Sequence, residues 1–102
     1  MIIYNVTVNI DHSVHDEWLQ WMKEVHIPDV MGTGIFLENR MLKVLGDEES
    51  GGHTYSVQYT CRSMDDFSRY EKVFAPGLRN QHAEKYKDKF VSFRTLLETV
   101  DS

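Results

Sequence analysis

The sequence is poor in the residues that build special chemistry or special architectures. Its single cysteine, Cys61, excludes an internal disulfide and any Cys-x-x-Cys metal or redox motif. Only two prolines and six glycines occur in 102 residues, which excludes collagen-like and low-complexity chains. No apolar run approaches the roughly twenty residues of a membrane-spanning helix, and the N-terminus lacks the basic segment of a signal peptide. We therefore expect a cytoplasmic protein that contacts no membrane.

Basic residues are also fewer than acidic residues. Eleven Lys and Arg residues stand against 16 Asp and Glu residues, so the formal net charge is −5 at pH 7. Such a chain repels a phosphate backbone, and nucleic acid is not an expected partner. Glycine-rich phosphate loops and nucleophile-elbow motifs are missing as well. The sequence therefore indicates no cofactor and does not by itself define a reaction.

What is present is the pattern of one ordinary folded domain over residues 1–102, with 41% hydrophobic residues. Two helix-start signals, Ser13-Val14-His15-Asp16 and Ser63-Met64-Asp65-Asp66, each follow a strand-like run. In both, the serine hydroxyl can accept from amides of the first turn, and the acid three residues later can bond back. The chain thus reads as a strand–helix–strand unit written twice.

Periodicity places the individual elements. Strands are expected at about 2–11, 35–45, 53–62 and 91–100. The first helix should run over about 14–26 and end before Pro28; a second helix should end before Ala75, and a short extra helix should cover about 78–89. The order βαββαβ predicts a ferredoxin-like α+β sandwich. Its four-stranded antiparallel sheet has strands one and three in the centre and both main helices on one face.

The sheet face without helices separates two classes of partner. On the central strands it carries only polar residues and no aromatic ring on which a base could stack, which disfavours RNA recognition; they are Asn5, Thr7, Asn9, Ser56, Gln58 and Thr60. The outer strands are instead apolar on both faces, and such strands need cover on both. We expect a homodimer with its sheets face to face. The alternative is that the edge residues pack under the protein's own loops.

Five segments carry a resemblance: Trp18-x2-Trp21-Met22, His26-Ile27-Pro28-x2-Met31-x-Thr33-Gly34-x-Phe36, Tyr55-Ser56-Val57-Gln58-Tyr59, Ala75-Pro76-Gly77-Leu78-Arg79-x2-His82 and Phe93-Arg94-Thr95-Leu96-Leu97-Glu98. With them the chain resembles the dimeric α/β-barrel superfamily, which includes antibiotic-biosynthesis-type monooxygenases, EthD-like proteins and stress-responsive barrel proteins. More closely, it is similar over its whole length to a family of short bacterial proteins, a domain of unknown function. The resemblance implies a dimer that binds small molecules between sheet and helices.

His26 is the first candidate for chemistry. EthD-like proteins resemble this chain in having a His-x-Pro at a similar place, and His26 could serve as a general base or ligand hydrogen-bonder at the mouth of a sheet–helix pocket. The alternative is a C-terminal cap, in which the imidazole satisfies the last carbonyls of the helix.

Candidate ligand-binding residues are those that could surround such a pocket: Tyr4, Tyr55, Tyr59, His82 and Arg94. The tyrosine hydroxyls need partners when buried, and His26 or His82 could supply them. Arg94 could hold a carboxylate, or pair with Glu38 or with a partner chain. All of these residues also have ordinary structural interpretations, as core aromatics, a half-buried histidine and an ion-paired arginine.

We expect no metal site, because His12 and His15 straddle a helix start, where the one-face spacing of a helical site is lost. Three functions stay open. The first is a small-molecule-binding homodimer, and the second is a cofactor-independent monooxygenase, isomerase or cyclase with His26 as acid/base. The third is a structural or regulatory dimer without a pocket.

Overall fold

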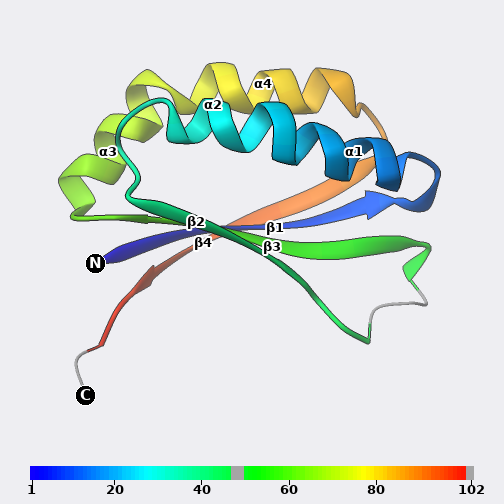
Figure 1. Ribbon diagram of the computed structural model, residues 1–102, viewed down its shortest axis with the longest axis horizontal. Coiled ribbons are helices and arrows are strands. Elements are labelled where there is room, and N and C mark those ends of the chain that lie inside the picture. Colours follow the sequence, from blue (N-terminus) through cyan, green and yellow to red (C-terminus); the bar gives the residue numbers. More distant parts are fainter. Residues whose placement is uncertain (47–49, 101–102) are drawn as a thin grey trace.

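The computed structural model describes residues 1–46 and 50–100 and confirms the ferredoxin-like fold. Its sheet consists of β1 (Ile2–Asp11), β2 (Glu38–Lys43), β3 (Gly52–Cys61) and β4 (Phe90–Glu98). The strands are ordered β2-β3-β1-β4 and are all antiparallel, so the first and third strands are central as predicted. All helices cover one face of this sheet (Figure 1).

The first helical segment is longer than predicted. It comprises η1 (His12–Val14), α1 (His15–Trp21), η2 (Met22–His26) and α2 (Ile27–Met31). The prediction that Pro28 ends the helix is wrong. In η2 the helix widens to a π turn, in which the N–H of Ile27 donates to the carbonyl of Met22. Pro28 then falls in the first turn of α2, where its missing N–H costs little.

Only one of the two predicted capping serines caps its helix. Ser63 accepts from the N–H of Asp66 at 3.1 Å and begins α3 (Met64–Val73) as predicted. At the other site the prediction is wrong, because Asp11 supplies the cap and its carboxylate accepts from both the N–H and the hydroxyl of Ser13. The carboxylate is the stronger acceptor, so the serine acts as a donor instead.

The last helix, α4 (Ala75–Lys85), begins three residues earlier and ends four residues earlier than expected. Pro76 lies in its first turn, a position that proline favours. α3 and α4 lie beside α1 and α2 in the same helical layer (Figure 1). No helix among the described residues is long and apolar enough to cross a membrane.

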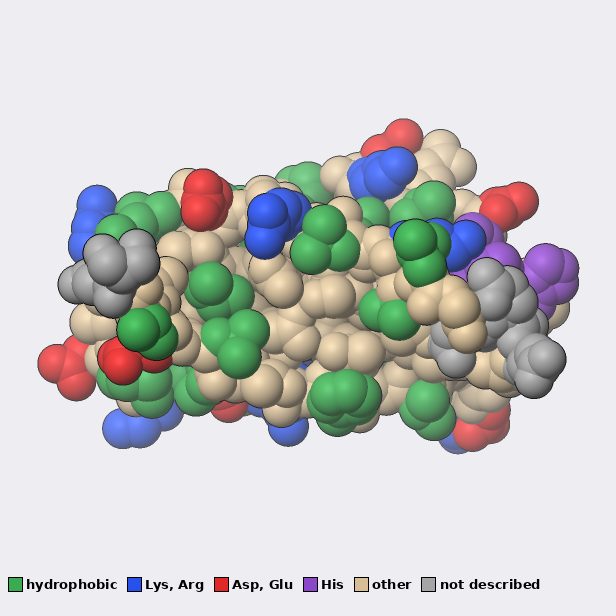
Figure 2. All heavy atoms as spheres, turned by 90° about the horizontal axis from the view of Figure 1, so that it is seen from below, with side chains coloured by type: hydrophobic (Ala, Val, Ile, Leu, Met, Phe, Trp, Pro, Cys, Tyr) green, Lys and Arg blue, Asp and Glu red, His purple; other side chains and the backbone are tan. Residues whose placement is uncertain are grey.

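The core lies between helices and sheet, and the other sheet face is open. Figure 2 shows hydrophobic side chains spread over that face, with most charged residues at its edge. Phe93 of β4 is 63% exposed there, and Leu42, Val91 and Leu97 are exposed as well. The alternative that the edge strands pack under the protein's own loops is therefore wrong for the described part of the chain.

Candidate functional site

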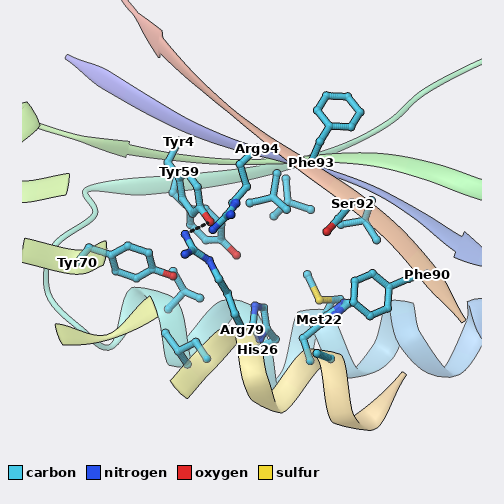
Figure 3. A pocket seen from close by; sticks show the side chains of 17 residues that line it. Tyr4, Met22, His26, Tyr59, Tyr70, Arg79, Phe90, Ser92, Phe93 and Arg94 are labelled. Carbon is cyan, nitrogen blue, oxygen red and sulfur yellow. Dashed lines mark hydrogen bonds between the residues drawn. The ribbon is translucent and has the colours of Figure 1, made fainter. Parts of the chain in front are cut away.

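A cavity of about 530 Å³ lies between the helical layer and the sheet (Figure 3). This volume is in the range of small-molecule sites. The side chains that line it come from every strand except β2 and from both helical segments; they are Tyr4, Val6, Val8, Met22, His26, Val30, Val57, Tyr59, Tyr70, Leu78, Arg79, His82, Ala83, Phe90, Ser92, Phe93 and Arg94.

The cavity opens between α4 and β4. The lining residues on β3 and deep in the core, such as Val57 and Tyr59, are buried. Ala83 of α4 and Ser92 and Arg94 of β4 are exposed although they line the same cavity. The exposed lining residues all lie on α4 and β4, so we place the entrance in the gap between these two elements.

His26 reaches this cavity from the π turn. Its ring stacks on Trp21, with 5.2 Å between ring centroids, and lies edge-on to His82 at 5.8 Å. Burial lowers the pKa of His26, partly offset by the charge of Asp29, so the imidazole is neutral at pH 7. Its Nδ1 is buried and has no hydrogen-bond partner among the described residues. The capping alternative is wrong, because the helix continues through His26 into α2.

His82 is held in one tautomer by its neighbour. The indole Nε1 of Trp18 donates to Nε2 of His82 at 2.9 Å, so the ring proton of neutral His82 is on Nδ1. Burial, aided by the nearby His26, lowers the pKa of His82 to about 4. The cavity therefore contains two histidines that are both uncharged at neutral pH.

Tyr4 is bound by a residue that the sequence analysis missed. Nη2 of Arg79 donates to the Tyr4 hydroxyl at 2.9 Å (Figure 3), and the same guanidinium pairs with Glu71 of α3 in two contacts. Burial acts to lower the pKa of Arg79, but Glu71 and Tyr4 together raise it, so the guanidinium stays charged. Arg79 precedes His82 by three residues, and residues at this spacing lie on the same face of a helix. The sequence could therefore have indicated that Arg79 faces the cavity together with His82.

Tyr59 lies against Tyr4, with 6.1 Å between the ring centroids, but its hydroxyl has no such partner. The hydroxyl is buried and makes no hydrogen bond with any described residue. Burial raises the pKa of Tyr59 well above its ordinary value, so the group stays protonated and can donate. The expectation that His26 or His82 would bind the tyrosine hydroxyls is wrong. Arg79 binds the Tyr4 hydroxyl, and the Tyr59 hydroxyl has no partner among the described residues.

Tyr55 does not line the cavity. Its hydroxyl is 2.7 Å from Nε2 of His15, and its ring lies against Trp18 at the other end of β3. The alternation that put Tyr55 and Tyr59 on one sheet face holds, but four residues along a strand span more than 12 Å. The two rings therefore belong to different parts of the core.

Arg94 projects from β4 into the entrance, toward Tyr4, Tyr59 and Arg79 (Figure 3), whereas the ring of Phe93 points away to the far side of the sheet. Pairing with Glu38 does not occur, because β2 and β4 are opposite edges of the sheet. Within residues 1–46 and 50–100, Arg94 forms no ion pair.

The histidines near the start of the first helix form a separate cluster. Nδ1 of His12 is 2.9 Å from Nε2 of His53, and the rings of His53 and His15 stack at 3.8 Å. No group of three or more residues in the described ranges has the arrangement of a metal site.

The order of the strands and the helical layer on one face of the sheet together define an α+β protein of the ferredoxin-like fold. The chain belongs to the family described as a domain of unknown function (DUF4286), whose model matches residues 1–100. No curated protein sequence is significantly similar to it.

Solved structures with the same fold are distant in sequence. A dimeric ferredoxin-like protein from an uncultured marine organism has a TM-score of 0.72 at 13% identity, over 100% of this chain and 97% of that one. SnoaB, a cofactor-independent oxygenase from Streptomyces nogalater, has a TM-score of 0.70 at 15% identity, over 99% and 95%. An ethyl tert-butyl ether D family protein from Bacillus halodurans has a TM-score of 0.67 at 10% identity, over 98% and 100%. At these identities the similarity shows the fold alone.

Proposed function

We propose that this protein is a homodimer that binds a small organic molecule in the cavity between sheet and helices. The observation that carries the proposal is the cavity itself, whose lining includes three residues with a buried polar atom that lacks a partner among the described residues: Nδ1 of His26, the Tyr59 hydroxyl and Nε of Arg79. Buried polar groups in folded proteins are nearly always hydrogen-bonded, and each orphaned group costs about 1–3 kcal/mol. A bound molecule with polar atoms would satisfy them.

The dimer part of the proposal rests on the open sheet face. Phe93 and Val91 of β4 and Leu42 of β2 are exposed on it, together with the polar central strands. A second copy is the simplest cover for such a face, because a two-fold axis brings the same apolar edges together. One of the similar structures is described as a dimeric ferredoxin-like protein, which supports this assembly.

The test uses a fluorescent dye and a variant that blocks the entrance. Anilinonaphthalene sulfonate, whose emission rises in apolar sites, should bind saturably to the native protein. Ala83→Trp places an indole in the entrance and should abolish that binding, while Gln81→Trp, an exposed position of the same helix outside the cavity, should leave it intact. Circular dichroism establishes that both variants are folded. Equal dye binding by Ala83→Trp and the native protein would overturn the proposal.

A cofactor-independent enzyme with His26 as acid/base is the second candidate. It is favoured by the neutral imidazole with its free Nδ1 beside the cavity, which can take up a proton from a bound molecule. SnoaB, described as a cofactor-independent oxygenase, shares the fold. His26→Gln should abolish turnover of a bound substrate while dye binding persists; turnover that survives this change rules out the role. The third candidate, a dimer without a pocket, is disfavoured by the cavity itself.

A further inference from the structure

The cavity has a charge of the opposite sign to the protein as a whole. The chain carries 16 Asp and Glu residues and a net charge of −5. Yet among the described residues that line the cavity there is no Asp or Glu, while two arginines, Arg79 and Arg94, are present. A cavity whose described lining carries arginines and no carboxylate is receptive to negative charge, even in an acidic protein.

The positive charge comes from the arginines alone. Burial lowers the pKa values of His26 and His82, so both rings are neutral at pH 7. The charge of Arg79 is already offset by its pair with Glu71 behind it. Arg94 has no carboxylate partner among residues 1–46 and 50–100, so its charge is available to form an ion pair with a ligand.

The two guanidinium groups also point toward the same part of the cavity (Figure 3). An anion placed between them would meet the charge of Arg94, which no described carboxylate offsets, and the N–H donors of Arg79. Away from the arginines the lining includes buried apolar side chains such as Val8 and Val57, beside the uncharged polar groups described above. The site therefore has a cationic entrance and an uncharged, mostly apolar interior.

We propose that the ligand is an amphipathic organic anion whose carboxylate, or an anionic group of similar geometry, binds at the entrance between Arg94 and Arg79 while its apolar body fills the interior. The proposal rests on the small-molecule binding proposed above and specifies the chemical class of the ligand. Arg94 is the specificity-determining residue, because a guanidinium meets an oxyanion with two parallel hydrogen bonds.

The experiment compares two dyes that differ by one anionic group. N-phenylnaphthylamine is anilinonaphthalene sulfonate without its sulfonate, so the pair isolates the contribution of the charge. The native protein should bind the sulfonate dye about fivefold more tightly, and this preference should shrink as salt is added, because the entrance is partly exposed to solvent. Arg94→Gln should remove most of the preference, while Arg69→Gln, the same change at an exposed site on α3, should not.

Each outcome is informative. Equal affinity of the native protein for both dyes, or equal behaviour of Arg94→Gln and Arg69→Gln, overturns the anionic ligand class but leaves binding in the cavity standing. Binding of neither dye overturns the proposed function itself. In a second arm, Glu71→Gln frees the charge of Arg79, so it should strengthen binding of the sulfonate dye several-fold and leave the neutral dye unchanged. Unchanged or weaker sulfonate binding in this variant also counts against the class.

Discussion

The indole nitrogen of Trp18 in α1 donates a 2.9 Å hydrogen bond to Nε2 of His82 in α4, across 64 positions of sequence. Both side chains are buried, and the bond ties the two helical segments together beside the cavity. It also sets the tautomer of His82, since only an unprotonated Nε2 can accept. Stability and the chemistry of the cavity are thus connected through this pair.

Trp18→Phe should lower the free energy of unfolding by about 2–4 kcal/mol, because it leaves an unfilled space and removes the donor of the hydrogen bond to the buried Nε2 of His82. Urea unfolding at pH 8 measures the loss. Trp21→Phe is the matched control: Trp21 is half-buried and its indole makes no hydrogen bond to another described residue, so its loss should be clearly smaller. Equal losses in the two variants would show that the hydrogen bond contributes nothing measurable.

Stability should fall as the solution becomes acidic. The pKa of His82 is about 4 in the folded protein against an ordinary value of 6.5, so the unfolded chain takes up a proton over a pH range in which the folded protein does not. The contribution is complete above pH 6.5 and is lost as the pH falls from 6.5 toward 4; between pH 8 and pH 5 the loss from His82 alone is about 2 kcal/mol. Burial lowers the pKa of His26 too, and adds a loss of the same sign.

His82→Gln isolates this contribution. Glutamine can still accept from Trp18 but does not titrate, so urea unfolding of the variant should depend less steeply on pH than that of the native protein. Parallel pH dependences for the two proteins would contradict the assignment of His82 as a buried neutral group.

Tyr59→Phe should leave the free energy of unfolding unchanged or raise it by up to about 1 kcal/mol, because it removes a buried hydroxyl that has no partner among the described residues. Tyr4→Phe is the comparison variant, because the Tyr4 hydroxyl does have a hydrogen-bond partner. It deletes one of the acceptors of Arg79, which keeps its pair with Glu71, and should cost about 1–2 kcal/mol. Thermal or urea unfolding in the absence of ligand distinguishes the two. A loss at Tyr59 as large as that at Tyr4 would mean that the Tyr59 hydroxyl has a structural role.

Phe93→Glu should convert the dimer to monomers, because it places a charge on each copy within the apolar β4 edge of the paired sheet faces. Val73→Glu controls for the charge: Val73 is 64% exposed, close to the 63% of Phe93, but lies at the end of α3 in the helical layer. Sedimentation equilibrium at micromolar concentration should give a dimer for the native protein and for Val73→Glu. A native protein that sediments as a monomer rules out the assembly.

Three of the four strands were predicted closely, whereas β2, expected over about 35–45, covers only Glu38–Lys43. The alternation from Ile2 to Asp11 predicted β1 to the residue. In a strand with one buried face, every second side chain is buried, so the sequence alternates between apolar and polar residues. The first helix was predicted too short. A proline usually ends a helix, but here the π turn before it rearranges the backbone hydrogen bonds, and no local pattern announces such a turn.

The residues of the candidate site were predictable one by one, but not as a group. Tyr4, Tyr59, His26, His82 and Arg94 were singled out, and all five line the cavity. Arg79 was missed, because a helix-surface arginine looks ordinary until the chain folds it toward the Tyr4 hydroxyl. Tyr55 was included wrongly with the cavity group, since shared parity on a strand says nothing about distance along it.

By itself, the sequence determined the order of the elements, the buried faces and the acidic balance, because these follow from local periodicity and composition. Tertiary structure alone decided that the cavity contains two arginines and no carboxylate among its described lining, and that the buried histidines there are neutral. The physical reason is that charge and protonation in a cavity depend on which distant side chains are neighbours and on how much water they exclude.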